Sequence, residues 1–174
     1  EVNAQDVPDL AKAAHFTLVA NLPYNVATPI ILTLLEKFDN LTSFLVMVQK
    51  EVADRLCAQP GNKTYGTPSV KLAWYGTAQK AGLIGRNVFW PAPNVDSALV
   101  YFKRNDNPKG SEQEKEKVFK IIDAAFQQRR KTLNAALKGI VPKEAYELSK
   151  IDSTRRGETL TCDEFLALCK AFNS

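Results

Sequence analysis

The first hundred residues alternate between the hydrophobic periods of strands and helices. Short apolar runs predict strands at 16–20, 42–48, 78–83 and 97–102, and amphipathic spacing predicts helices at 7–14, 28–38 and 49–58. The run at 42–48 is apolar almost throughout, which is typical of a strand buried on both faces. Residues 69–75 carry both signals, so a helix and a strand stay open there. This alternation predicts an α/β layer structure.

Helical spacing alone governs the chain beyond a polar, turn-forming linker at 105–110. We therefore expect two domains, 1–104 and 105–174, of which the second is all-helical. Its helices are expected at 112–137, at 142–150, and after a capping box formed by Thr161 and Glu164. The residues expected on the buried faces of the first and third of these helices are Val118, Ile122, Ala125, Phe126, Leu133, Ala136, Leu137, Phe165, Leu168, Cys169 and Phe172.

One charged residue interrupts the apolar face of the helix expected at 112–137. Arg129 lies near the centre of that face, where a charge is costly unless it has a partner. We expect its guanidinium group to bind a carboxylate or the backbone of the first domain.

The composition, with 45% hydrophobic and 24% charged residues, is that of an ordinary globular chain. No apolar run reaches membrane-spanning length. Cys57, Cys162 and Cys169 lack the spacing of a zinc site or a disulfide framework, and we expect neither a metal nor a disulfide. This cysteine usage fits a reducing cytoplasm. His15 is the only histidine, and we expect it to be structural, which leaves no pairing of histidine with a nucleophile.

Charge is unevenly distributed along the chain. Residues 1–102 hold 8 Lys+Arg and 8 Asp+Glu, whereas residues 103–174 hold 15 and 11, so the tail carries the whole net charge of +4. Such an excess indicates either a nucleic-acid footprint or an ordinary solvated surface. The candidates for phosphate contacts are Lys103, Arg104, Arg130 and Lys131.

The tetrapeptide Asn21-Leu22-Pro23-Tyr24 follows the first expected strand and matches a known solution for methylating an exocyclic amine on a base. An adenine N6 is a poor nucleophile because its lone pair is delocalised into the ring. A carboxamide oxygen and a main-chain carbonyl can accept its two hydrogens, while Pro23 stiffens the turn and Tyr24 offers a stacking face. The alternative is a strand followed by an ordinary turn, which these residues also favour.

The chain resembles the small-subunit ribosomal RNA adenine dimethyltransferases of the bacterial KsgA type, and four segments carry the resemblance. They are Asn21-Leu22-Pro23-Tyr24-Asn25 with Thr28-Pro29; Gln49-Lys50-Glu51 through Tyr65-Gly66; Phe89-Trp90-Pro91-Ala92-Pro93-Asn94-Val95-Asp96-Ser97-Ala98; and Phe126-Gln127-Gln128-Arg129-Arg130-Lys131-Thr132. The resemblance implies the C-terminal half of a Rossmann-like methyltransferase sheet followed by a small all-helical domain. It also implies S-adenosylmethionine as co-substrate, no metal, and small-subunit ribosomal RNA or its precursor particle as the partner.

Site roles follow from the same resemblance. Asn21, Leu22, Pro23 and Tyr24 would serve the target amine, and Asn21 would also touch S-adenosylmethionine. Phe89 would pack against the target base, although a core aromatic beside a proline-rich turn is its alternative. Asp96 and Ser97 are expected to hold the loop in place rather than to take part in the chemistry.

The chain departs from the family at one point, because the glycine-rich loop and acidic residues that grip the cofactor have no counterpart here. By the family's order, the chain corresponds to the C-terminal part of a longer cytoplasmic enzyme. This piece alone is expected to be inactive, to bind S-adenosylmethionine weakly, and to expose the strand at 16–20 as a sheet edge. This piece would then self-associate, unless the missing N-terminal part belongs to the protein and is absent only from the sequence given.

Two other functions stay open for the complete protein. One is methylation of large-subunit ribosomal RNA by the related resistance enzymes, against which Leu22 and the run 128–132 argue. The other is a non-catalytic ribosome-assembly or transcription factor built on the same fold.

Overall fold

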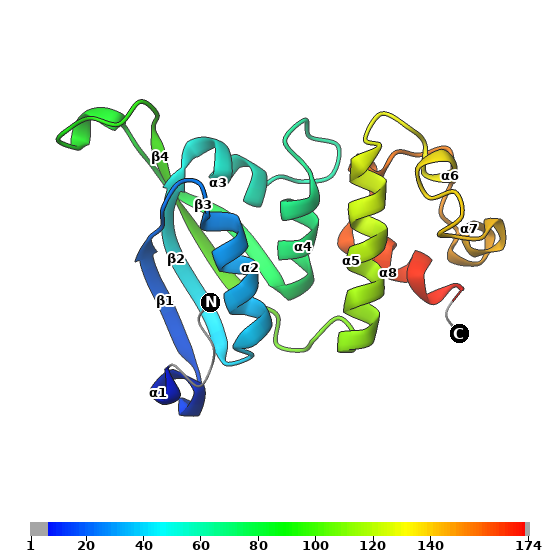
Figure 1. The fold of residues 1–174 in the computed structure, drawn as a ribbon, viewed down its shortest axis with the longest axis horizontal. Helices are drawn as coiled ribbons and strands as arrows, with labels where there is room; N and C mark the ends of the chain where they lie inside the picture. Colours follow the sequence, from blue (N-terminus) through cyan, green and yellow to red (C-terminus); the bar gives the residue numbers. More distant parts are fainter. Residues whose placement is uncertain (1–6, 173–174) are drawn as a thin grey trace. The chain divides into compact units, whose positions relative to one another are not determined.

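A computed structural model of the chain describes residues 7–172. Helices and strands alternate along the first part, and only helices follow the last strand (Figure 1). In chain order the elements are α1 (Pro8–Lys12), β1 (Phe16–Asn21), α2 (Ala27–Lys37), β2 (Leu41–Gln49), α3 (Lys50–Leu56), α4 (Thr67–Tyr75), β3 (Gly76–Ile84), η1 (Arg86–Val88), β4 (Ser97–Arg104), α5 (Glu112–Gln127), α6 (Leu133–Ala136), α7 (Lys143–Ser149), η2 (Gly157–Thr159) and α8 (Cys162–Lys170). The predicted α/β class is confirmed.

The chain divides into two compact units that differ from the expected domains in one segment. The sheet unit comprises the chain up to Cys57 together with Tyr75–Asp106, and the helical unit comprises Ala58–Trp74 together with the chain from Asn107 onward. The division near residue 106 lies close to the boundary expected at 104. The segment Ala58–Trp74, however, packs with the tail rather than with the sheet. The two expected domains stay a prediction.

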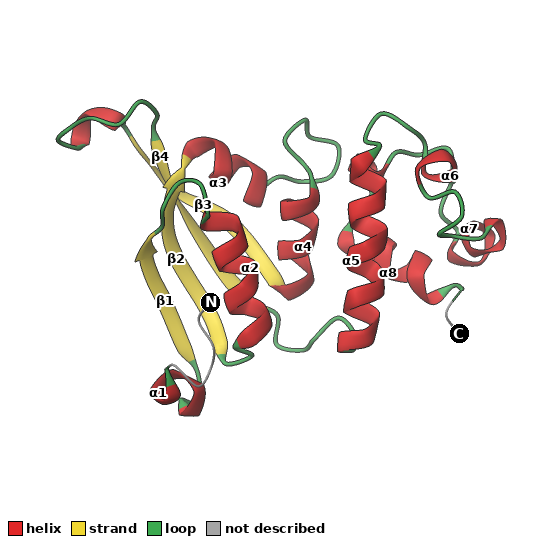
Figure 2. Cartoon of the chain, viewed as in Figure 1, coloured by secondary structure: helices red, strands yellow, loops and turns green. Residues whose placement is uncertain are grey.

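Among the described residues, the sheet unit has four strands in the order β1-β2-β4-β3. They are drawn in yellow in Figure 2. β1 runs parallel to β2, whereas β4 runs antiparallel to both of its neighbours. The pairing of β1 with β2 sets Asn21 opposite Met47 at the end of β1. Within the described chain β1 is an edge strand, as the sequence predicted.

The core of the sheet unit lies on one face of the sheet. The rings of Phe44 and Phe102 stack with their centroids 4.6 Å apart, and neither is accessible to solvent. On the other face Leu45 is half-buried, and Val19 is 73% exposed. The prediction that 42–48 is buried on both faces was therefore wrong. Within 42–48 only Phe44, Val46 and Val48 are buried. In the described chain α2 and α3 lie on one side of the sheet (Figure 1).

In the helical unit, the long helix expected at 112–137 is two helices. α5 ends at Gln127, a turn follows, and α6 covers only Leu133–Ala136. The backbone N–H groups of Leu133 and Asn134 donate to the carbonyls of Arg155 and Ser153, at 2.7 and 3.0 Å. Because a distant loop takes donors that a continuous helix would use internally, the helix breaks there.

Capping boxes begin two of the tail helices. Thr161 and Glu164 form the predicted one at the start of α8, and Ser111 with Glu114 forms a second, which was not predicted, at the start of α5. The Ser-x-x-Glu spacing before an apolar helix was the signal for it. The expected buried residues of α8 are buried, except that Phe172 lies beyond the helix end and is half-exposed.

The ambiguous segment after residue 66 is the helix α4, and side-chain contacts join its part of the chain to the tail. The Tyr65 hydroxyl donates to the Leu160 carbonyl at 2.6 Å. Lys71 pairs with Asp123 at 2.8 Å, and the ring of Trp74 meets that of Phe119 edge-on. These contacts explain why Ala58–Trp74 belongs to the helical unit.

Candidate functional site

The first candidate site is the turn between β1 and α2. The Leu22 N–H donates to the Met47 carbonyl at 3.1 Å, which extends the pairing of β1 with β2 by one residue. Leu22 is buried and anchors the turn, and the Val26 N–H donates to the Pro23 carbonyl at 3.4 Å. The fold of this turn therefore depends on backbone groups and on one apolar side chain.

The side chain of Asn21 is not used by this turn. It is exposed, and within residues 7–172 its carboxamide has no hydrogen-bond partner. Asn21, Leu22, Pro23 and Tyr24 line a hollow of about 320 Å³. The structure thus brings the four residues predicted from the tetrapeptide together around one open space.

Tyr24 is held from behind by the start of β4. Its hydroxyl lies 3.3 Å from the Ser97 hydroxyl, and either group can donate. Ser97 is fully buried, whereas the Tyr24 ring is only half-buried. This contact fixes the far end of the ring, so the aromatic face beside the hollow is presented in one orientation.

The loop between β3 and β4 is anchored at both ends. The Arg86 N–H donates to the Asp96 carboxylate at 3.0 Å, and the Arg86 guanidinium donates to the Asn94 carbonyl at 2.9 Å. The Asp96 carbonyl accepts the Lys50 N–H at 2.9 Å. These bonds agree with the anchoring role expected of Asp96. Phe89 is half-buried on this loop, and its contact with a target base stays a prediction.

Arg104, expected to contact phosphates, has a different role in the structure. Its guanidinium donates to the carbonyls of Leu41, Leu35 and Phe38, at 2.7, 2.8 and 2.9 Å. It also lies over the Tyr75 ring, and burial lowers the pKa of the guanidinium. This arrangement joins the end of α2 to β4, so we do not retain Arg104 as an RNA contact.

In the described chain, the turn after α5 holds one arginine that is bound to other residues and two cations that are not. Arg129 is half-buried, pairs with Glu158 at 2.8 Å and donates to the Lys63 carbonyl at 2.7 Å. It thus binds a carboxylate and a backbone, as expected, although both partners lie in the helical unit. Arg130 and Lys131 are exposed and form no ion pair with any described residue. Gln127–Lys131 line a hollow of about 460 Å³.

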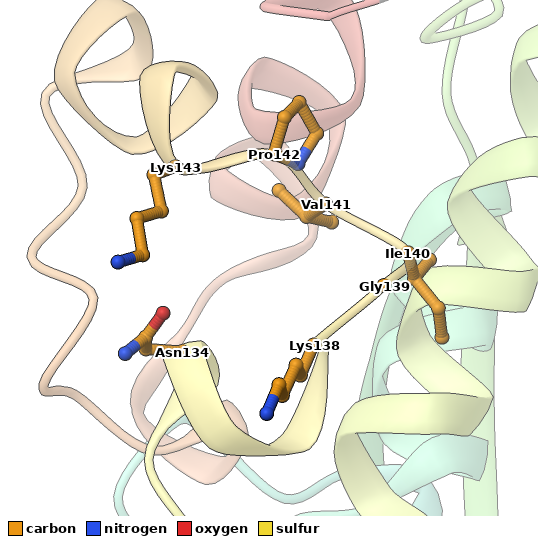
Figure 3. Close-up of a pocket in the computed structure, with 7 residues that line it drawn as sticks. All are labelled: Asn134, Lys138, Gly139, Ile140, Val141, Pro142 and Lys143. Atoms are coloured by element: carbon orange, nitrogen blue, oxygen red, sulfur yellow. The ribbon is translucent and has the colours of Figure 1, made fainter.

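Lys103 is the remaining predicted cation. It lies on β4, is exposed, and has no ion-pair partner in the described part of the chain. A further hollow of about 380 Å³ lies between α6 and the start of α7, with Lys138, Lys143 and Asn134 among its lining residues (Figure 3). None of the predicted site residues lines it.

The cysteines are poorly suited to chemistry. Burial raises the pKa of Cys57 to about 11 and that of Cys162 to about 12, so neither thiol ionises near neutral pH. Among residues 7–172, no group of three or more His, Cys, Asp or Glu side chains could hold a metal ion. No helix in the same range is both long and apolar enough to span a bilayer.

One strongly exposed residue of the anchored loop was not predicted. Trp90 follows Phe89 on this loop and is 97% exposed. The signal available in the sequence was its position in a proline-rich segment, because such segments form loops at the surface.

Comparisons with known proteins identify the family of the chain. The family model described as ribosomal RNA adenine dimethylase matches residues 2–174. A ribosomal RNA small subunit methyltransferase A from Bifidobacterium adolescentis is 68% identical over 99% of this chain, and one from Streptomyces griseus is 52% identical over 97%. The chain spans 59% and 60% of those two proteins.

Solved structures share the fold. The crystal structure of a dimethyladenosine transferase from Plasmodium falciparum has a TM-score of 0.80 and 22% identity, covering 94% of this chain and 70% of that one. The 23S rRNA methyltransferase ErmE has a TM-score of 0.70 and 18% identity, covering 91% and 66%. Such identities show the fold alone, which is that of Rossmann-like methyltransferases. With the family match over nearly its whole length, the chain belongs to the ribosomal RNA adenine dimethylase family.

Proposed function

We propose that the full-length protein carrying this chain transfers methyl groups from S-adenosylmethionine to adenine N6 in small-subunit ribosomal RNA in the cytoplasm. The observation that carries the proposal is the carboxamide of Asn21, which is exposed in an open hollow and has no partner among residues 7–172. The relatives at 68% and 52% identity bear the name of small-subunit enzymes, which supports the substrate.

The proposed chemistry relies on hydrogen-bond acceptors rather than on an acid or a base. The sulfur of S-adenosylmethionine leaves with the electron pair of its bond to the methyl group, and the methylated N6, now positively charged, releases a proton to water. The Asn21 carboxamide oxygen and a main-chain carbonyl accept the two N6 hydrogens of adenine and direct the nitrogen lone pair out of the ring system. The Leu22 carbonyl is our candidate for the second acceptor, because the Pro23 carbonyl already accepts the Val26 N–H. Because these acceptors are fixed before the base arrives, they act by positioning and electrostatics.

Aromatic rings would hold the base in place. The face of Tyr24 beside the hollow stacks on the adenine, and Phe89 closes on it from the other side. S-adenosylmethionine supplies the electrophilic methyl group, and in this chain Asn21 is the residue proposed to touch it. A target adenine must leave its stack to enter the hollow, so an unpaired loop is the natural substrate.

The cations proposed to contact RNA are Lys103 of the sheet unit and, separately, Arg130 and Lys131 of the helical unit. All three are exposed and lack an ion-pair partner in the described range. Each can neutralise a phosphate and release a counterion, which makes binding dependent on salt.

The test is the change Asn21→Ala in the full-length protein. We expect methyl transfer to purified small-subunit particles to fall at least about 100-fold, as when a preorganised polar group is removed from other active sites. RNA affinity and the thermal midpoint should not change, because Asn21 takes no part in the packing of the turn.

The matched control is Asn107→Ala, which removes an exposed carboxamide from the linker. Unchanged transfer by Asn21→Ala would refute the proposed role of this residue. Transfer to large-subunit RNA alone would favour the related resistance enzymes, and no transfer by the parent protein would favour a non-catalytic assembly factor.

A further inference from the structure

Trp90 is the most exposed large apolar residue that the structure describes in the sheet unit. It is 97% exposed, whereas Trp74, the other tryptophan, is 5% exposed. Val88 and Val95 on the same loop are exposed as well. Large exposed apolar groups that cluster on one segment mark a surface that another molecule covers.

The loop that carries Trp90 is fixed rather than free. Its two ends are joined by Arg86, Asn94 and Asp96, and the Phe89 N–H donates to the Arg86 carbonyl at 3.3 Å. Phe89 has an extended backbone conformation, with φ −102° and ψ 149°, and is half-buried. The chain bends at Phe89 and Trp90, and the side chain of Trp90 is left almost fully exposed.

The loop is continuous with the candidate methyl-transfer site. Its last anchor, Asp96, precedes Ser97, and the Ser97 hydroxyl lies 3.3 Å from that of Tyr24, which lines the hollow. The strand register also places Ile84 and Ser97, which bound the loop, at the same edge of the sheet as Asn21. The loop that carries Trp90 therefore begins and ends at the edge where the hollow lies. The exposed apolar segment is short, and stable protein partners require far more area, of the order of 800 Å² on each side.

We propose that Trp90 is a stacking platform for an unpaired nucleobase next to the target adenine. This inference rests on the proposed function, because an adenine that leaves its stack also unstacks its neighbour. An aromatic ring offers any base a face, so the platform binds with little sequence preference. Trp90 is thus a positioning residue that holds the strand while Asn21 and Tyr24 hold the target.

The experiment uses the full-length protein and intrinsic fluorescence. The difference between the emission of the parent and that of Trp90→Phe isolates the signal of Trp90. In free protein, iodide should quench this signal readily. A short single-stranded RNA with a central adenine should quench it and protect the residual signal from iodide, and the blunt duplex of the same sequence should do neither.

Binding and turnover give the second readout. Trp90→Ala should weaken binding of the single-stranded RNA about ten-fold, in line with the loss of one stacked base. Trp90→Phe should keep most of that affinity because it retains a ring. With small-subunit particles, Trp90→Ala should raise KM about ten-fold and leave kcat within two-fold. Val88→Ala, at another exposed apolar residue of the loop, is the matched control and should change neither.

Three results would overturn the inference. One is poor iodide access to Trp90 in the RNA-free protein, which would mean that another part of the protein or a second copy covers the ring. Another is unchanged RNA affinity of Trp90→Ala, and the third is an equal loss in Val88→Ala. The proposed function fails separately: a parent protein whose Trp90 responds to RNA but which transfers no methyl group would refute the activity and leave the platform intact.

Discussion

The turn after β1 and the turn after α5 use their polar residues in opposite ways. In the first, backbone bonds and the buried Leu22 hold the chain, so the carboxamide of Asn21 has no partner among residues 7–172. In the second, the guanidinium of Arg129 holds the turn through Glu158 and the Lys63 carbonyl. A polar side chain is therefore available for chemistry only where the fold does not use its hydrogen-bonding groups.

The largest effect on this comparison should come from Arg129→Ala. The change leaves Glu158 and two backbone carbonyls without their donor, so we expect the free energy of unfolding to fall by about 2 kcal/mol, as for hydrogen bonds to charged groups. Urea unfolding of the full-length protein, followed by circular dichroism, measures it. Arg130→Ala is the neighbouring control and should not alter stability. Equal losses in both variants would contradict the distinction between them.

Removing the positive charges of Arg130 and Lys131 should weaken RNA binding and leave the stability of the protein unchanged. The double change Arg130→Gln/Lys131→Gln removes two phosphate contacts, so the slope of log affinity against log salt should become shallower by about 1.4 for single-stranded RNA. Filter binding over a salt series measures this slope.

A control with the same change in net charge is Lys120→Gln/Lys143→Gln, at two exposed lysines of the helical unit. An identical slope for both pairs would show that general charge, rather than this turn, attracts the RNA.

The smallest effect on methyl transfer should come from the contact between the Tyr24 and Ser97 hydroxyls. Tyr24→Phe removes only the 3.3 Å contact with Ser97, so methyl transfer should fall about two-fold to three-fold, in line with the loss of one weak hydrogen bond. Tyr24→Ala, which removes the ring, should lose far more. Initial rates on small-subunit particles distinguish the two. A double-mutant cycle with Ser97→Ala should show that the two hydroxyls are coupled.

Local patterns predicted most of the fold. Strands and helices in the first hundred residues were expected close to their observed bounds, because hydrophobic period is a property of neighbouring residues. The break after Gln127 could not be predicted in that way. It depends on the carbonyls of Ser153 and Arg155, which only tertiary packing brings to the start of α6.

The candidate site shows the same limit. The tetrapeptide at Asn21 could be recognised because its residues are consecutive and line one hollow. The structural role of Arg104 could not, because the three carbonyls that it binds belong to a helix end and to a neighbouring strand. A basic residue beside other basic residues gives no sign of whether its donors are already occupied.

The place of Ala58–Trp74 has a practical consequence for exchanging parts between family members. Because this segment packs with the tail through Tyr65, Lys71 and Trp74, the polypeptide enters the helical unit twice. A chimera that swaps only the C-terminal portion would pair a foreign helix bundle with a resident α4. Grafts that carry both pieces together keep their mutual contacts. Substitutions in Ala58–Trp74 and in the tail should therefore be compatible only as matched sets.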